Sequence, residues 1–324
     1  MPGTQPIPDD WDLKWTRNES FEIQTSGSTG DPKPCELLPH LIKWSAEQTR
    51  KHFIQSNSLH QLLAIPIEKV GGFMQWARAK TWNTPIDIVK PSANPLLEYT
   101  GSAKITSLTP MQIEGILSHP ESRKKLLDFE SILIGGGPIS GEIEERLIRE
   151  FPNIHWVHTF GMTETYSHFA GRILGQPTYT LIDETEISQN EIGLCLKNPC
   201  TENRWMQTHD LVEITASNRF VWTGRSDFTI NSGGIKIQLE TVELEIQKLT
   251  GWSSRDFFCW GEPDAVLGQR LVLYAKMGLH LSDDLQFSSR YYRPKHVYHI
   301  SDFIYSNSDK IVRAKTVEAF LIRP

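Results

Sequence analysis

The chain has 324 residues, of which 39% are hydrophobic and 22% charged, and its formal net charge is −6. This length favours two domains with a sizeable core, and the acidic balance argues against broad electrostatic binding to nucleic acid or anionic lipid. The four cysteines are too few for a disulfide framework, and Cys195 and Cys200 lack the spacing of a zinc site. The start of the chain does not resemble a signal peptide and no long apolar run occurs, so we expect a soluble cytoplasmic protein without a membrane span.

The first half of the chain alternates short apolar runs with helical patterns, after a start that we expect to be an irregular lead-in over residues 1–20. Strands are predicted at Phe21–Gln24, Leu62–Ile67, Ile86–Val89, Ile105–Leu108 and Ser131–Ile134. A helix is predicted from Pro39 to about Ser56, and a second, amphipathic helix follows Ser140 as its N-cap. This order of elements predicts an α/β layer with a largely parallel sheet.

The last third of the chain is expected to form a smaller α+β domain. Short strands at Leu211–Thr215 and Phe220–Thr223 are predicted to precede it, and its own strands are predicted at Asp256–Cys259, Leu271–Ala275 and Val297–Ile300. One apolar stripe of a helix is formed by Leu239, Val242, Ile246 and Leu249. Gly224–Asp227 is expected to join the two parts, so we expect one domain over residues 1–226 and another over residues 227–324. No internal repeat or low-complexity segment interrupts them.

The densest chemical signal is the segment 25–33, which reads TSGSTGDPK. Its glycines let backbone N–H groups wrap around phosphate oxygens, its hydroxyls donate hydrogen bonds, and Lys33 adds positive charge. The segment lacks the Gly-x4-Gly-Lys-Ser/Thr pattern of a Walker A loop. An ordinary polar turn between strands is the alternative interpretation.

Two further strings suit nucleotide chemistry. A glycine turn, residues 135–137, follows the strand at Ser131–Ile134 but does not satisfy the dinucleotide-binding pattern. The string Phe160–Glu164 offers an aromatic face for a base and a hard carboxylate ligand for Mg²⁺ beside a triphosphate. The Thr163 hydroxyl between them can bond a phosphate or a carboxylate.

Further strings follow in the order Gln207–Asp210, Gly224–Asp227, Gly233–Ile237 and Ser308–Arg313. With the segment 25–33, they resemble the motifs of the acyl-adenylate-forming, or AMP-binding, enzymes, which include acyl-CoA synthetases, luciferases and peptide-synthetase adenylation domains. The resemblance runs from residue 25 to residue 313. It implies a large N-terminal adenylate-forming domain, shortened at its start, and a small mobile α+β C-terminal domain.

The resemblance also implies a role for each matching residue. The ATP phosphates are expected to be held by Thr25, Ser26, Gly27, Ser28, Thr29, Gly30 and Lys33. The adenine and ribose are expected to lie against Gly136, Gly137, Pro138, Phe160, Gly161, Asp210 and Arg225. The hinge and the path of the thiol are expected at Asp227, Gly233, Gly234 and Lys236. Catalysis is expected from Thr163, Glu164 and Lys310, with Glu164 as the Mg²⁺ ligand.

The chain departs from the family pattern at three places. His209 and Asp309 stand where glycine is usual, and only 24 residues precede the first loop. This compact form is similar to the short o-succinylbenzoate–CoA ligases of menaquinone synthesis. The acid is expected to contact Gly71, Gly72, His168 and Arg172, and Arg172 is a candidate cation for a second carboxylate.

The resemblance therefore implies an AMP-forming acid–thiol ligase that uses ATP, Mg²⁺ and coenzyme A to activate a small carboxylic acid. The acid expected first is o-succinylbenzoate. The chain is expected to bind no nucleic acid, and a homodimer is the assembly considered for it. Three alternatives stay open. One is a ligase for another aryl or fatty acid, another is a carrier protein in place of coenzyme A, and the third is a catalytically weak sensor that binds nucleotide or acyl-adenylate.

Overall fold

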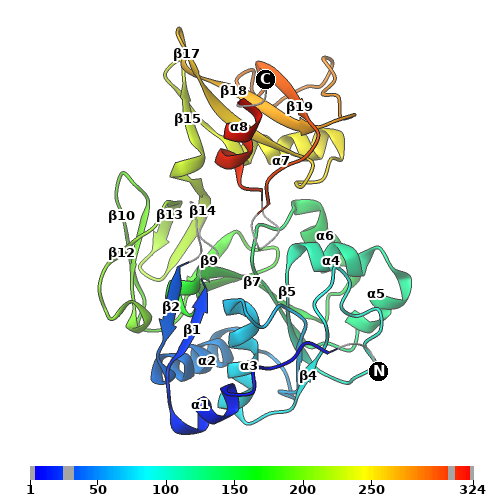
Figure 1. Ribbon diagram of the computed structural model, residues 1–324, viewed down its shortest axis with the longest axis vertical. Coiled ribbons are helices and arrows are strands. Elements are labelled where there is room, and N and C mark those ends of the chain that lie inside the picture. The colour runs from blue at the N-terminus through cyan, green and yellow to red at the C-terminus, as the bar shows by residue number, and fades with distance from the viewer. Residues whose placement is uncertain (1–3, 25–32, 306–310, 322–324) are drawn as a thin grey trace. The chain divides into compact units, whose positions relative to one another are not determined.

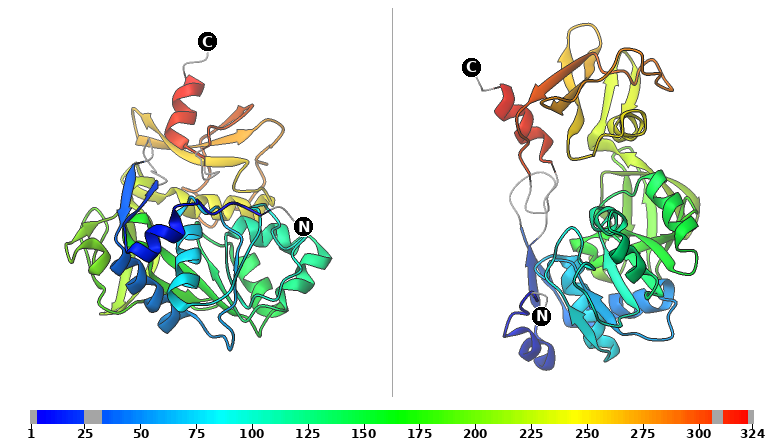
Figure 2. Two further views of the ribbon diagram at one scale, coloured as in Figure 1. Left: turned by 60° about the horizontal axis from the view of Figure 1, so that its bottom comes forward. Right: turned by 90° about the vertical axis from the view of Figure 1, so that its right-hand side faces the viewer.

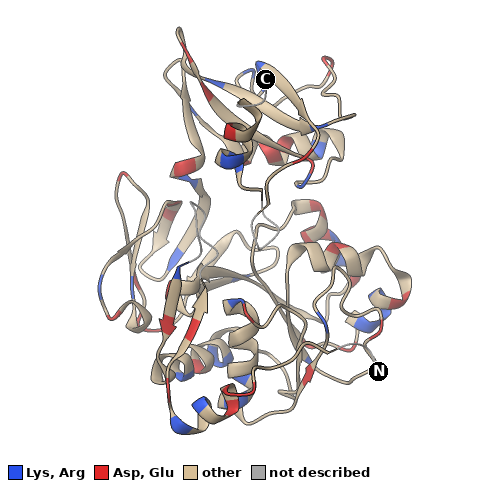
Figure 3. Cartoon of the chain, in the orientation of Figure 1, with Lys and Arg blue, Asp and Glu red and all other residues tan. Residues whose placement is uncertain are grey.

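The computed structural model describes residues 4–24, 33–305 and 311–321 (Figure 1). The chain divides into two compact units, and basic and acidic residues occur in both of them (Figure 3). Unit 1 comprises Met1–Ser188, Cys195–Met206 and Glu213–Val221, and unit 2 comprises Gln189–Leu194, Gln207–Val212 and Trp222–Pro324. The hinge at Asp227 stays a prediction.

The α-helices are α1 (Trp11–Arg17), α2 (Pro39–Phe53), α3 (Val70–Trp82), α4 (Pro110–Leu117), α5 (Pro120–Leu126), α6 (Gly141–Glu150), α7 (Leu239–Thr250) and α8 (Arg313–Leu321). Short 3₁₀ turns lie at Thr163–Thr165, Pro199–Thr201 and Ser226–Phe228. Ser140 caps α6 as predicted, because its hydroxyl accepts a hydrogen bond from the N–H of Ile143. No helix within the described residues is long and apolar enough to cross a membrane.

The strands of the first half are β1 (Phe21–Gln24), β2 (Pro34–Leu37), β3 (Gln61–Leu63), β4 (Ile86–Ile88), β5 (Ile105–Leu108), β6 (Ser131–Ile134), β7 (His155–Met162), β8 (Ser167–Ile173) and β9 (Thr178–Leu181). The strands of the second half are β10 (Glu186–Gln189), β11 (Leu194–Lys197), β12 (Met206–Gln207), β13 (Asp210–Ala216), β14 (Arg219–Arg225), β15 (Thr229–Ser232), β16 (Ile235–Gln238), β17 (Phe257–Asp264), β18 (Gly268–Lys276) and β19 (His296–Ile300).

The expected irregular lead-in is wrong in part, since α1 lies within it (Figures 1 and 2). The ring of Trp11 in this helix is buried and lies 5.0 Å from Phe73 and 5.1 Å from Trp76 between ring centroids. These contacts join α1 to the hydrophobic core beneath α3, so tertiary packing stabilises a helix too short to persist alone.

The central sheet has the strand order β13-β14-β9-β8-β7-β6-β5-β3-β4. Neighbours from β4 to β7 are parallel, whereas β8 runs antiparallel to β7 and to β9. The sheet is therefore mixed, and the expectation of a largely parallel sheet is corrected. The reason is local: only residues 163–166 join β7 to β8, which is too short for the crossover that a parallel strand requires.

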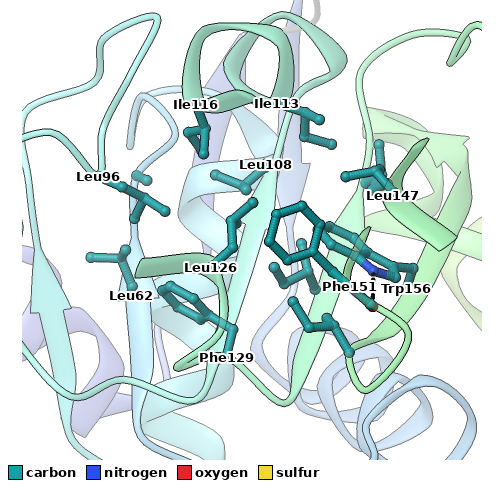
Figure 4. Close-up of a cluster of buried hydrophobic side chains, with 14 of the residues drawn as sticks. Leu62, Leu96, Leu108, Ile113, Ile116, Leu126, Phe129, Leu147, Phe151 and Trp156 are labelled. Atoms are coloured by element: carbon teal, nitrogen blue, oxygen red, sulfur yellow. Dashed lines mark hydrogen bonds between the residues drawn. The ribbon is translucent and has the colours of Figure 1, made fainter. Parts of the chain in front are cut away.

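The parallel half of the sheet packs against helices through a large apolar core (Figure 4). Its buried residues include Leu62, Leu96, Leu108, Ile113, Ile116, Leu126, Phe129, Leu147, Phe151 and Trp156. Trp156 also donates its indole N–H to the carbonyl of Phe151 at 3.2 Å, so its polar atom is satisfied inside the core. This core fixes β6 and β7, whose carboxyl ends carry the predicted glycine turn and the Phe160–Glu164 string.

Unit 2 contains the sheet β16-β15-β18-β17, with β19 added parallel to β18. Alternate residues of β17 point to opposite faces. Phe257 packs in the core that includes Val242 and Ile246 of α7, whereas Phe258 packs with Val317 of α8. The two helices thus cover opposite faces of one sheet, and the predicted fold class is confirmed.

Candidate functional site

The segment 25–33 joins two antiparallel strands of unit 1. The Cα partners Gln24 and Pro34 close the register of β1 and β2, so the two residues that flank the segment lie side by side. The predicted phosphate ligands Thr25, Ser26, Gly27, Ser28, Thr29 and Gly30 lie outside the described residues. Lys33 is exposed at the start of β2.

The turn that contains Glu164 lies against β2. Tyr166, in a left-handed backbone conformation, accepts a hydrogen bond from the N–H of Leu38 at 2.9 Å through its hydroxyl. Burial raises the pKa of the Cys35 thiol on β2, and the negative charge of Glu164 raises it further. Thr163 is buried while Glu164 is exposed. The structure therefore brings the predicted metal ligand to the strand that leaves the hydroxyl-rich segment.

Gly161 is required by the packing of β7 on β8. A Cβ at this position would come within 2.0 Å of the carbonyl oxygen of Ser167. The register of the two strands shifts between Phe160 and Gly161, which is the signature of a β-bulge. The glycine of this motif therefore allows the close approach that aims the Thr163–Thr165 turn.

The glycine turn after β6 is tied to β7 and β9 by one buried histidine. The Nε2 of His158 bonds the carbonyl of Gly137 at 3.0 Å, and its Nδ1 bonds the hydroxyl of Tyr179 at 2.8 Å. Because a carbonyl only accepts, Nε2 carries the proton and Nδ1 accepts from tyrosine. Burial lowers the pKa of His158, which favours this neutral form. Gly136 has a φ of 87°, a conformation that favours glycine.

The predicted adenine residue Phe160 stands in an aromatic cluster of unit 1. Its ring centroid lies 5.3 Å from Tyr179, 5.5 Å from Phe169 and 5.4 Å from Phe220, all in edge-on contacts. Phe160 itself is half-buried. Together with the His158 bridge, this places Phe160, Gly161 and the glycine turn at the carboxyl ends of adjacent parallel strands, where α/β sheets usually bind ligands.

The predicted acid contacts Gly71 and Gly72 lie in the first turn of α3, which begins at Val70. Gly72 is required there because a Cβ would come within 2.2 Å of the carbonyl oxygen of Pro66. The sequence interpretation missed Arg78 on the same helix, which is only 2% exposed. Its Nη2 donates to the hydroxyl of Ser167 at 2.9 Å, and its Nε has no hydrogen-bond partner among the described residues.

Arg78 is a buried cation without a carboxylate partner in the described part of the chain. Burial lowers its pKa to about 10, so it stays charged at neutral pH. Buried charges in proteins are normally paired. The signal available in the sequence was a single charged residue, Arg78, in the run from Phe73 to Ala79, where Gln75 is the one other polar residue.

His168 neighbours this arginine and is fully enclosed. Its Nε2 bonds the Thr49 hydroxyl at 2.9 Å and its Nδ1 bonds the Ser167 hydroxyl at 3.1 Å. Burial lowers its pKa well below the ordinary value, with a further contribution from the charge of Arg78. Neutral His168 thus serves as a buried hydrogen-bonding group, and its predicted contact with the acid stays a prediction.

Arg172 already has a carboxylate partner. Its guanidinium makes two hydrogen bonds to Glu144, at 2.7 Å and 2.6 Å, and the two side chains are 13% and 15% exposed. Burial acts to lower the pKa of Arg172, but the hydrogen bonds and negative charges of Glu144 and Tyr179 together raise it. The structure thus pairs Arg172 with α6, and its predicted contact with the acid stays untested.

Unit 2 brings together the predicted ribose residues. The carboxylate of Asp210 is buried, and Arg225 lies 3.6 Å from it while donating two hydrogen bonds to Asp227, at 2.9 Å and 2.7 Å. His209, where the family has glycine, has no left-handed φ. Its Nδ1 lies 3.2 Å from the Ser226 hydroxyl, so this side chain fits the local turn.

The remaining predicted residues also belong to unit 2. Gly233 and Gly234 form the exposed turn between β15 and β16 with φ values of 60° and 83°, and Lys236 is exposed on β16. Lys310 and Asp309 lie outside the described residues. Just beyond them, Ile311 forms an antiparallel bridge with Tyr305.

Comparison with known proteins gives a consistent assignment. The family model described as AMP-binding enzyme matches residues 20–204. A curated probable 2-succinylbenzoate–CoA ligase from Mycobacterium tuberculosis is 26% identical over 79% of this chain and 70% of its own length.

Two solved structures extend the comparison. An acyl-CoA synthetase (AMP-forming)/AMP-acid ligase II-like protein from Dyadobacter fermentans is 29% identical, with a TM-score of 0.63 and coverage of 97% of this chain and 96% of that one. The o-succinylbenzoate coenzyme A synthetase of Bacillus subtilis, in complex with ATP and magnesium ion, shares the fold at a TM-score of 0.75 and 18% identity, over 91% of this chain and 69% of that one. Because the family model covers more than half of the residues, this chain belongs to the AMP-binding enzyme family.

Proposed function

We propose that the chain is an ATP-dependent carboxylic acid–coenzyme A ligase, and that its acid carries a second carboxylate, with o-succinylbenzoate as the first candidate. The reaction class is supported by the family and by the relatives named above. The acid class is supported by one observation, the buried and uncompensated charge of Arg78 beside Ser167.

The proposed reaction has two steps. A carboxylate oxygen of the acid first attacks the α-phosphorus of ATP, so that the acyl-adenylate forms and pyrophosphate leaves. The coenzyme A thiol then loses its proton and attacks the adenylate carbonyl carbon, and AMP leaves with the bonding electrons. No protein nucleophile is needed, because the adenylate is already the activated species.

Positioning and charge neutralisation are the main contributions asked of the protein. In this proposal the segment 25–33 holds the leaving pyrophosphate, and Phe160 and the glycine turn hold the adenine. Asp210 and Arg225 hold the ribose and α-phosphate, and Lys310 neutralises charge at the reacting oxygens. The Gly233–Gly234 turn borders the path of the thiol. A rotation of the small domain about Asp227 converts the enzyme from the adenylate-forming to the thioester-forming arrangement.

Glu164 is the residue proposed to hold Mg²⁺. The described residues contain no group of three His, Cys, Asp or Glu side chains arranged for a metal. A single exposed carboxylate fits an ion that takes most of its other ligands from phosphate and water. When bound, that ion would screen the charge of the triphosphate. ATP and coenzyme A as co-substrates support a cytoplasmic location for this activity.

Arg78 bears on the acid because of where its neighbours lie. It comes from α3, the helix that opens with the predicted acid-contacting glycines, and it bonds Ser167 directly after the turn that contains Glu164. A guanidinium with an unused buried N–H is suited to a carboxylate. A monocarboxylic acid would leave that charge uncompensated after its own carboxylate had reacted.

The experiment is acid-dependent release of pyrophosphate, measured with o-succinylbenzoate, each of its two monomethyl esters, benzoate and a medium-chain fatty acid. We expect release with the diacid and weak release with the esters. Thioester formation is then measured with coenzyme A. The variant Lys310→Ala is expected to lose adenylation while still converting preformed adenylate to thioester, and equal loss of both steps would refute that role.

The other outcomes separate the alternatives. Release with benzoate or the fatty acid at the rate of the diacid would refute the second carboxylate but keep the ligase. ATP binding without release for any acid would favour a nucleotide sensor. Transfer to a carrier protein but not to coenzyme A would replace the proposed thiol.

A further inference from the structure

The predicted ribose ligand Asp210 is held by a side chain that the motifs do not include. Asp210 is 6% exposed at the start of β13. The indole Nε1–H of Trp222, on the neighbouring strand β14, donates to its Oδ1 at 3.1 Å. All of these atoms belong to unit 2.

Arg225 does not fix the orientation of this carboxylate. Its closest approach to Asp210 is 3.6 Å, beyond hydrogen-bond range, and its fork is directed to both oxygens of Asp227. Burial raises the pKa of Asp210, and this effect is opposed first by the charge of Arg225, then by the bond from Trp222 and then by a bond from the Thr208 side chain. Arg225 therefore supplies charge, while Trp222 supplies a directional bond.

We infer that Trp222 is a positioning residue for the nucleotide, which holds one oxygen of Asp210 so that the remaining lone pairs face the ribose hydroxyls. An ionised carboxylate has about four acceptor sites, and one indole bond leaves enough of them for a vicinal diol. Trp222 donates from within the protein, so its bond is already in place when the nucleotide arrives and no ordering is required at that moment. The inference rests on the proposed role of Asp210.

The test compares Trp222→Phe with the wild type by calorimetric titration of ATP and of 2′,3′-dideoxy-ATP. Phenylalanine keeps an aromatic ring but removes the N–H donor. The matched control is Trp44→Phe, because Trp44 in unit 1 also donates its indole N–H to a carboxylate, that of Glu184, at 3.0 Å. Asp210→Asn provides the reference for loss of the ribose ligand.

We expect Trp222→Phe to weaken ATP about tenfold, the effect of one hydrogen bond to a charged group. Dideoxy-ATP, which has no ribose hydroxyls, should bind both proteins alike. Trp44→Phe should bind ATP as the wild type does. A turnover assay should show the loss of Trp222→Phe mainly in the KM for ATP rather than in kcat.

The outcomes separate this inference from the proposed function. If Asp210→Asn leaves ATP affinity unchanged, the ribose role of Asp210 is wrong. If Asp210→Asn weakens ATP but Trp222→Phe does not, only the inference is overturned. Equal weakening of ATP and dideoxy-ATP would also overturn it, because the ring would then act by packing. If Trp222→Phe does not fold, benzothienylalanine at position 222 replaces the N–H by sulfur in a ring of the same shape, and the same criteria apply.

Discussion

Replacing Arg78 with methionine should maintain or increase the stability of the protein while weakening its activity toward a diacid. The side chain is 2% exposed. Among the described residues it donates a hydrogen bond to Ser167, and no carboxylate there compensates its charge. Methionine has a similar length, no charge and no hydrogen-bond requirement. The variant therefore removes a buried ion without leaving a partner ion unpaired.

The magnitudes follow from this geometry. Burying an ion costs several kcal/mol, and replacing buried ionic groups by apolar residues of similar volume is often neutral or stabilising by about 1–4 kcal/mol. We therefore expect the free energy of unfolding of Arg78→Met to equal or exceed that of the wild type. A hydrogen bond to a charged group contributes about 1.5–3 kcal/mol, so the KM for a diacid should rise roughly 10- to 100-fold.

The assay is urea denaturation together with acid-dependent pyrophosphate release. Arg78→Lys is the matched control, since it keeps the charge but loses the planar fork, and it should recover part of the KM. The KM for ATP should not move. If Arg78→Met lowers stability by several kcal/mol and leaves the KM for the diacid unchanged, Arg78 is a structural residue and the reasoning is refuted.

Two further predictions concern buried ion pairs, one in each unit. Arg172→Met should destabilise unit 1 by about 2 kcal/mol or more, because it leaves the largely buried Glu144 without its bidentate partner; the KM for the acid should not change, and a large rise in that KM would instead support the contact between Arg172 and the acid. In unit 2, burial raises the pKa of Glu243 to about 7 despite its 2.8 Å ion pair with Arg313. In the unfolded chain the pKa of this carboxyl is near 4.5, so the folded state takes up the proton at a higher pH. Stability from this group is present at low pH and is lost as pH rises toward 7, by at most about 1.4 kcal/mol per pH unit. Glu243→Gln should abolish that part of the slope in urea denaturation between pH 5 and 7.5, and an unchanged slope would contradict the assignment.

Short strands bounded by turn residues were predictable from local sequence. Phe21–Gln24, Ile105–Leu108 and Ser131–Ile134 are observed with the predicted bounds, because each apolar run stops at a residue that favours a turn or a helix cap. The helix α1 was not predictable in this way. Its stability depends on Trp11 meeting the ring of Phe21 in β1 and the rings of Phe73 and Trp76 in α3, and α3 is distant in sequence.

The motifs were predictable for a different reason. They combine residue types that packing alone does not require, such as Gly161 where a Cβ would strike the strand opposite and Glu164 exposed on a turn. Their order along the chain was enough to identify the family. The direction of β8 was not predictable from the motif, because it depends on how few residues join β7 to β8.

The two arginines show where a one-dimensional interpretation reaches its limit. Arg172 was chosen for the acid because it follows the Thr163–Glu164 motif closely in sequence, yet α6 brings Glu144 to it and neutralises its charge. Arg78 lies far upstream, yet the contact between α3 and the start of β8 brings it next to the same motif, and no carboxylate among the described residues pairs with it. Distance along the chain favoured Arg172, whereas an acid bound in the folded protein is attracted by a cation whose charge no nearby carboxylate neutralises. The informative feature was therefore Arg78, the one basic residue in the mainly apolar run from Phe73 to Ala79. Burying its charge is costly unless an anion binds to it.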